Sequence, residues 1–125
     1  MASELRVNTL KDAAGNNSIA TSFVAGGSAK CFAFITDINT IVKSLNTSSI
    51  SDDATGNFTI TVASEMSSIN EAVLGTACNS AANPSNSTIT GKMESTTTIA
   101  AEACGNNGAS TDIPFCSIAV FGDLE

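Results

Sequence analysis

The sequence predicts an all-β protein whose body is an antiparallel β-sandwich, jelly-roll-like, built from short strands. Ser, Thr and Asn supply 44 of the 125 residues, whereas charged residues make up only 14%. Helical bundles need Leu, Glu, Lys and Arg for their faces, but Thr-rich outer faces and Asn/Gly turns suit strands. About seven short apolar runs alternate with turn residues, which is typical of a sandwich. A chain of this length can bury its own core.

The N-terminal residues are predicted to form a strand, a turn and a second strand. Leu5, Val7 and Thr9 alternate with polar residues, so they face one way in the first strand. Residues 12–17 contain Asp, Gly and two Asn, which predicts a turn. Residues 18–24 follow as a weaker second strand.

Residues 1–27 are expected to be an N-terminal assembly arm, and residues 28–125 the β-sandwich body. The sequence Gly-Gly-Ser at 26–28 predicts a short flexible joint between them. Because a lone two-stranded hairpin is marginal in water, the arm is expected to pair with another chain by strand addition. The candidate assembly residues are Leu5, Val7, Thr9 and Leu10.

The first half of the body contains the strongest strand patterns. Residues 30–35, KCFAFI, are nearly all apolar, which predicts a strand covered on both faces. Residues 40–46 form a weaker strand pattern, and residues 51–57 are dense in turn residues. In residues 58–63, Phe58, Ile60 and Val62 are expected to point inward and the intervening Thr residues outward.

The second half of the body predicts four more strands. They are the buried strand 72–78, the more exposed pair 87–93 and 95–101, and the central strand 115–122, with a long loop at 104–111. One helical turn is considered only for residues 64–72, where a loop is favoured. The expected core positions include Phe32, Phe34, Ile60, Val62, Val73 and Val120.

The composition removes most catalytic arrangements. Without His, Tyr or Trp, a Ser–His–acid triad is impossible. A carboxylate pair for glycoside hydrolysis needs only Asp and Glu, so a glycosidase stays as a minor alternative. Nearly all of its candidates fall in predicted turns or at strand ends, where solvated carboxylates are the simpler interpretation. The candidates are Asp37, Asp52, Asp53, Glu65, Glu71, Glu94, Glu102 and Asp112. We therefore expect no enzyme, no catalytic residue and no cofactor.

The spacing of the acidic residues and of the cysteines also disfavours metal sites. Residues 52–57 lack the spacing of a calcium loop and have no closing Glu, so a hairpin turn is the simpler interpretation. The four cysteines contain no C-x-x-C pair, which disfavours zinc. Reduced thiols are the first expectation, but one pair closing late outside the cell stays open. These cysteines are Cys31, Cys78, Cys104 and Cys116.

The charge pattern disfavours nucleic acid and membrane partners. The net charge is −7, and the five basic residues stand singly along the chain. Nucleic-acid binding needs clustered Lys and Arg. No run approaches the roughly 18 apolar residues of a membrane span, and the N-terminus lacks the pattern of a signal peptide. A soluble acidic protein is expected.

Several stretches resemble one group of proteins. The opening MASELRVNTLKD followed by GNN at 15–17 matches the pattern M-A-S-x-L-x-V-x-T-L/I-K-D/N-x-x-G-N-N. Residues 29–35, AKCFAFI, match an A-K-(A/C)-(W/F) strand, and the ending FGDLE resembles a G-D-L ending. Residues 44–75 resemble an S-x-N-V-S-S-I-T-D-x-G-T-G-x-(Y/F)-T-(V/I) hairpin followed by an A-M-x-x-x-N-Y-A-V segment. In these motifs the chain resembles short virion and tail-fibre proteins of marine and cyanobacterial tailed phages.

The resemblance departs from the group at defined places. Phe32, Phe58 and Glu71 stand where the group usually has Trp or Tyr, and residues 79–113 match no motif of the group. Any partner specificity carried by that region is therefore unreadable from the sequence.

The resemblance implies a non-enzymatic virion structural protein, assembled in the bacterial host cytoplasm and commonly a homotrimer. A small capsid-decorating cement or knob protein, or a fibre-like surface component, fits a chain of this length. The alternative is a receptor-binding tip module of a tail fibre that recognises a host surface glycan or protein. Expected partners are other copies, capsid or tail proteins and, for the alternative, a host receptor. Copy number per virion separates capsid decoration from a tail device.

Overall fold

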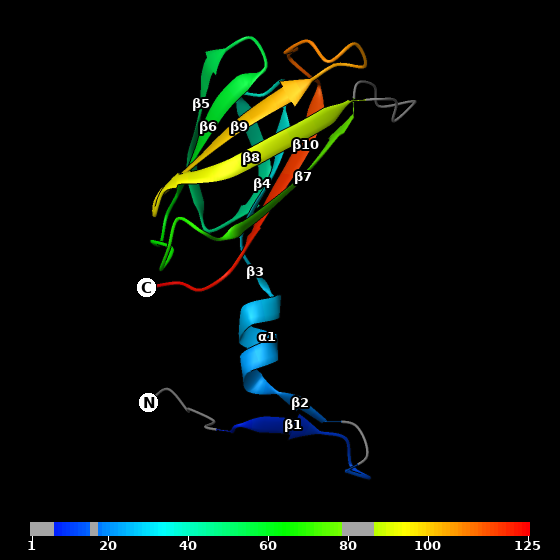
Figure 1. Cartoon of the computed structure of the whole chain (residues 1–125), viewed down its shortest axis with the longest axis vertical. Coiled ribbons are helices and arrows are strands. Elements are labelled where there is room, and N and C mark those ends of the chain that lie inside the picture. Colours follow the sequence, from blue (N-terminus) through cyan, green and yellow to red (C-terminus); the bar gives the residue numbers. More distant parts are fainter. Residues whose placement is uncertain (1–6, 16–17, 79–86) are drawn as a thin grey trace.

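The computed structural model describes residues 7–15, 18–78 and 87–125 (Figure 1). Within these residues, the chain forms one helix and ten strands. Eight of the strands build the body, and the first two precede the helix. The elements are β1 (Thr9–Lys11), β2 (Ser18–Ala20), α1 (Thr21–Gly27), β3 (Ala29–Thr36), β4 (Thr40–Leu45), β5 (Thr47–Ala54), β6 (Asn57–Val62), β7 (Ala72–Cys78), β8 (Thr88–Ser95), β9 (Thr98–Cys104) and β10 (Phe115–Phe121).

Two four-stranded antiparallel sheets face each other in the body. Their strand orders are β4-β3-β10-β7, which we call the β3/β10 sheet, and β5-β6-β9-β8, which we call the β6/β9 sheet. Hairpins join β3 to β4, β5 to β6 and β8 to β9, while β10 pairs with both β3 and β7 from the far end of the chain. The predicted all-β antiparallel sandwich is confirmed.

The core lies between the sheets and follows from alternation along each strand. In β6, Phe58, Ile60 and Val62 are buried and the intervening residues are half-buried, as predicted. Cys31, Ala33 and Ile35 of β3 face them from the other sheet, because side chains of successive strand residues point to opposite faces. Among the expected core positions, Ile60, Val62 and Val120 are buried, and Val73 packs partly buried against the core.

The two sheets approach closely where β7 packs against β8. A Cβ atom added to Gly75 would lie 2.4 Å from Cγ2 of Ile89, and one added to Gly91 would lie 3.0 Å from Cγ1 of Val73. At Gly75 this approach requires glycine, because real Cβ contacts do not become so short, and at Gly91 a Cβ atom would force Val73 to shift. The small residues at this edge therefore bring the two sheets together (Figure 1).

Of two predicted loops, the first is shorter than expected and the second agrees with the expectation. The turn predicted for residues 51–57 shrinks to Thr55 and Gly56, because β5 continues to Ala54. Gly56 has φ +72° and its N–H donates to Oδ1 of Asp112 at 2.6 Å. Residues 64–71 form a loop without a helical turn, as favoured, and Met66 of this loop is buried.

The N-terminal prediction was wrong about residues 18–24, which are not one strand. β2 ends at Ala20, and Thr21–Gly27 form α1, so Gly26 and Gly27 end a helix instead of forming a flexible joint. The Thr21 hydroxyl and N–H both donate to the carbonyl oxygen of Asn8, which holds the start of the helix against the residue that precedes β1. Val7 and Asn8, which were expected to belong to the first strand, precede β1, and residues 4–6 lie outside the described residues.

Candidate assembly site

The N-terminal segment, here the described residues before β3, lies beyond one end of the sandwich (Figure 1). β1 and β2 pair antiparallel, with Leu10 opposite Ile19. The turn between them is tightened by the N–H of Gly15 donating to Asp12 O at 3.0 Å. None of the described residues in this segment is buried. Its apolar side chains therefore pack into no core of their own.

The structure places three of the four predicted assembly residues on this segment. Val7 precedes β1, and Thr9 and Leu10 lie within it, all exposed. Leu5 lies outside the described residues. The expectation was that Leu5, Val7 and Thr9 share one strand face. Of these residues the structure describes Val7 and Thr9, and only Thr9 lies in β1. The role of these residues in assembly stays a prediction.

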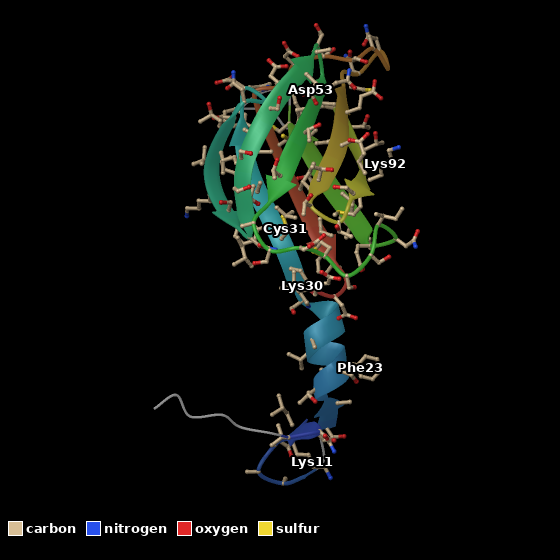
Figure 2. All side chains as sticks on the ribbon, turned by 90° about the vertical axis from the view of Figure 1, so that its left-hand side faces the viewer. Lys11, Phe23, Lys30, Cys31, Asp53 and Lys92 are labelled. Atoms are coloured by element: carbon tan, nitrogen blue, oxygen red, sulfur yellow. The ribbon has the colours of Figure 1, made fainter. Side chains whose placement is uncertain are left out.

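Sequence reasoning missed the larger apolar side chains of the same segment. Phe23 is 73% exposed, and Ile19 and Val24 are also exposed. Figure 2 shows the Phe23 ring projecting sideways from α1. Only Phe23 and Val24 lie on α1, because Ile19 belongs to β2, so no helical period marked these residues in the sequence.

The helix α1 has little local support. None of its seven described residues is buried, and its N-cap residue Ala20 makes no side-chain cap hydrogen bond. Helices shorter than about 12 residues are marginal in water without packing. At its C-terminal end, the Lys30 ammonium donates to the carbonyl oxygens of Ala25 and Ser28, a favourable position for a cation. Packing of its apolar side chains would add the stabilisation that the segment lacks.

A second apolar surface lies on the outer face of the β3/β10 sheet. Phe32 and Phe34 point outward there, which corrects their expected core position, because Cys31, Ala33 and Ile35 take the inward places of β3. Phe32 is 39% exposed. The ring of Phe34 stacks on Phe115, with centroids 6.4 Å apart. The apolar run at residues 30–35 is thus covered on one face within the described chain, instead of both.

The outer face of the β6/β9 sheet is polar by contrast. Its outward positions carry Thr residues on β6, β8 and β9, together with Lys92 and Glu102. A shallow hollow of about 330 Å³ lies among them, and its polar lining side chains are Asn57, Thr90, Lys92 and Glu102. Figure 2 shows Lys92 and Asp53 on the surface of the sandwich.

The carboxylates considered for catalysis are used to hold loops and strands. Asp53 accepts hydrogen bonds from Ser51 and Thr59 at 2.9 and 2.7 Å. Glu102 accepts from the Ser110 hydroxyl at 2.6 Å, and Asp112 fixes the turn at Gly56. Across the described parts of the chain, no three His, Cys, Asp or Glu residues are grouped as a metal site would require. These contacts give Asp53, Glu102 and Asp112 a structural role.

The buried cysteines are poor nucleophiles. Burial raises the pKa of the Cys116 thiol to about 11. Burial also raises the pKa of Cys31, partly opposed by a hydrogen bond with the Thr47 hydroxyl at 3.3 Å. The thiolate is the reactive form, so both groups are protonated and unreactive at neutral pH. Cys78 and Cys104 are half-buried, and no disulfide joins any of the four, all of which the structure describes.

Within the described residues, no helix has the length and apolar character needed to cross a membrane. Comparison of the chain with models of protein families, with curated proteins and with solved structures found no match. The site is therefore interpreted from its own geometry. Two apolar surfaces stand out: the N-terminal segment and the outer face of the β3/β10 sheet.

Proposed function

We propose that this chain is a non-enzymatic structural subunit of a phage virion surface, which assembles through its N-terminal segment. One observation carries the proposal. Apolar side chains at positions 7, 10, 19, 23 and 24 are presented on a short hairpin and helix outside the sandwich core. Contiguous exposed apolar groups on a stable fold mark interaction sites. The segment is thus best explained as the part that joins the subunit to its neighbours.

The virion assignment rests on the resemblance of the opening, the residue 29–35 strand and the FGDLE ending to virion and tail-fibre proteins of tailed phages. A homotrimer assembled in the bacterial host cytoplasm follows from the same resemblance. Closed cyclic symmetry is the usual outcome when identical chains assemble. Copy number per virion separates a capsid-decorating role, at hundreds of copies, from a tail appendage, at a handful.

The first test compares the full-length protein with residues 28–125 by light scattering. Every buried described residue lies at or after Cys31, so the shortened chain keeps the whole described core. We expect the full-length protein to form an oligomer, three copies under the virion proposal, and the shortened protein to be a folded monomer. A monomeric full-length protein, together with a shortened protein that cannot fold, would contradict the proposal.

A receptor-binding module is the second candidate, and the hollow on the β6/β9 sheet favours it. Asn57, Thr90 and Lys92 offer amide, hydroxyl and ammonium groups, which hydrogen-bond sugar hydroxyls. Binding of host surface glycans to immobilised protein tests this candidate. Loss of that binding in Lys92→Ala, with self-assembly unchanged, would establish a receptor site separate from the assembly surface.

A further inference from the structure

We propose that the outer face of the β3/β10 sheet is the acceptor for the N-terminal segment of a second copy of this chain. This inference rests on the proposed function and names the surface to which the segment attaches. The surface is a groove along β10, and its occupant is α1 with the apolar residues beside it.

The groove is built from side chains in register across four strands. One row crosses the sheet as Leu45, Phe32, Ala119 and Leu74, each directly opposite the next. The row beside it runs Lys43, Phe34, Ser117 and Thr76, so that small Ser117 lies between Phe34 and Thr76 and the charged Lys43 lies at the β4 edge, outside the hollows described next. Small side chains on β10 thus form a floor between larger side chains on β3 and β7.

The floor encloses a hollow of about 510 Å³, with lining side chains that include Phe32, Phe34, Leu74, Ala119 and Phe121. A second hollow of about 220 Å³ shares Phe34 and Ser117 with it and extends to Phe115. None of the described residues that line either hollow is charged. The groove therefore suits an apolar, uncharged occupant.

The N-terminal segment has matching chemistry and size. Its helix, TSFVAGG, carries no charged residue and presents Phe23 and Val24. Seven helical residues span roughly 10 Å. The groove follows β10 from Phe121 to Phe115, a strand length of roughly 20 Å, so the helix fits along it. Ala119 leaves room for one inserted ring between Phe32 and Leu74, and Phe23 is the ring available.

Charge favours the segment over a second sandwich as the occupant. Residues 1–28 contain two acidic and two basic side chains, so the net charge of −7 is carried by residues 29–125. Two sandwiches packed groove to groove would bring two strongly acidic bodies together. The neutral segment can cover the same apolar face without that repulsion.

The geometry favours a second copy, and not the same chain, as the source of the segment that fills the groove. α1 joins the start of β3 and extends away from the sandwich (Figure 1). Its Phe23 ring projects from the helix below the sandwich, which carries the groove (Figure 2). Each copy then offers one segment and one groove. Such a contact is heterologous, and it closes into a ring when the rotation between copies allows.

Two single substitutions test the two sides of the contact. Phe23→Asp removes the donor ring, with Ser22→Asp as its control on the same exposed helix. Ala119→Glu fills the floor of the groove. Its control, Ala100→Glu, makes the same change at an outward position of a central strand in the other sheet. Self-association is measured by analytical ultracentrifugation, and circular dichroism reports folding.

We expect Phe23→Asp and Ala119→Glu each to weaken self-association by about a hundred-fold or more, as loss of an interface anchor does. The two controls should assemble as the unchanged protein does. If Phe23→Asp is monomeric but Ala119→Glu assembles normally, the segment attaches elsewhere and this assignment is wrong, while the proposed function stands. A monomeric unchanged protein would contradict the proposed function itself.

The decisive experiment mixes the two variants. The Phe23→Asp protein keeps an intact groove, and the Ala119→Glu protein keeps an intact segment. Their mixture should therefore form a pair of one copy each, at concentrations where each variant alone is monomeric. Pair formation also shows that both variants are folded. A mixture that stays monomeric, while the unchanged protein is an oligomer, would overturn the assignment.

Discussion

The outer faces of the two sheets differ sharply, although their inner faces are alike. Inward positions of β6 and of β3 are both filled by apolar residues in strict alternation. Outward positions carry mainly Thr, Lys and Glu on the β6/β9 sheet, whereas the β3/β10 sheet presents a row of Phe, Leu and Ala beside a second row that contains Lys43, Ser117 and Thr76. Antiparallel sheets in water commonly have one solvated polar face.

The core therefore accounts for only part of the apolar residues in the β3/β10 sheet. The inner set fills the sandwich core, whereas Phe32 and Leu74 on the outer face are 39% and 60% exposed. Large exposed apolar patches mark interaction sites. We therefore propose assembly, and not folding, as the role of Phe32 and Leu74.

The largest expected effect comes from the core that the two sheets share. Val62 is buried in β6, so Val62→Asp places a carboxylate among apolar side chains. We expect a loss of at least about 4 kcal/mol in unfolding free energy, which removes much of a typical domain's stability. Its matched control is Thr61→Asp on the outward side of the same strand, expected to cost about 1 kcal/mol or less. Urea unfolding followed by circular dichroism measures both, and equal losses would contradict the assigned faces.

A smaller effect should separate the two outer faces. Phe32→Thr gives the β3/β10 face the character of the other sheet. Because Phe32 is outside the core, we expect folding to survive and self-association to weaken by about ten- to hundred-fold. Thr61→Ala changes the polar face and should leave self-association unchanged. A globally unfolded Phe32→Thr protein would show that Phe32 belongs to the core after all.

The smallest predicted effect is a loss of stability at alkaline pH. The Cys116 pKa is raised to about 11 in the folded protein, above its ordinary value of 9.0. The thiolate is thus favoured by unfolding, so the stability is intact below pH 9 and falls as pH rises toward 11. Cys116→Ala removes the thiol that causes this fall in unfolding free energy. We therefore expect the unfolding free energy of the variant to fall by about 1–2 kcal/mol less over the same pH range. Unfolding free energies of both proteins between pH 8 and 11 provide the measurement, and parallel pH profiles would contradict the prediction.

The sequence predicted the sandwich because strand alternation is a local pattern. In β6, each apolar residue is two positions from the next, so its inward face is readable without knowing the partner strands. The strand at 72–78 has the bounds of β7, but the prediction that it is buried was wrong, because β7 is an edge strand with no buried residue. The strand predicted at 95–101 is not exposed as expected either, because β9 lies inside its sheet and buries alternate residues. The core positions in β6 and β10 followed directly.

The assembly surfaces were harder to predict because they depend on what covers a face. KCFAFI showed that both sides of the strand at 30–35 are apolar, but not that the described chain covers only one of them. α1 was missed because seven residues make barely two turns, too few for a clear helical period. Its Phe23 was therefore absent from the predicted assembly residues.

The central claim is that the N-terminal segment of one copy covers the β3/β10 face of another. A photo-reactive phenylalanine analogue at position 23 tests it, in an oligomer assembled from equal amounts of light and heavy isotope-labelled protein. We predict that mass spectrometry finds links from position 23 to β3, β7 or β10 in peptides of mixed light and heavy label. Links confined to one chain, or links to the β6/β9 sheet, would contradict the claim.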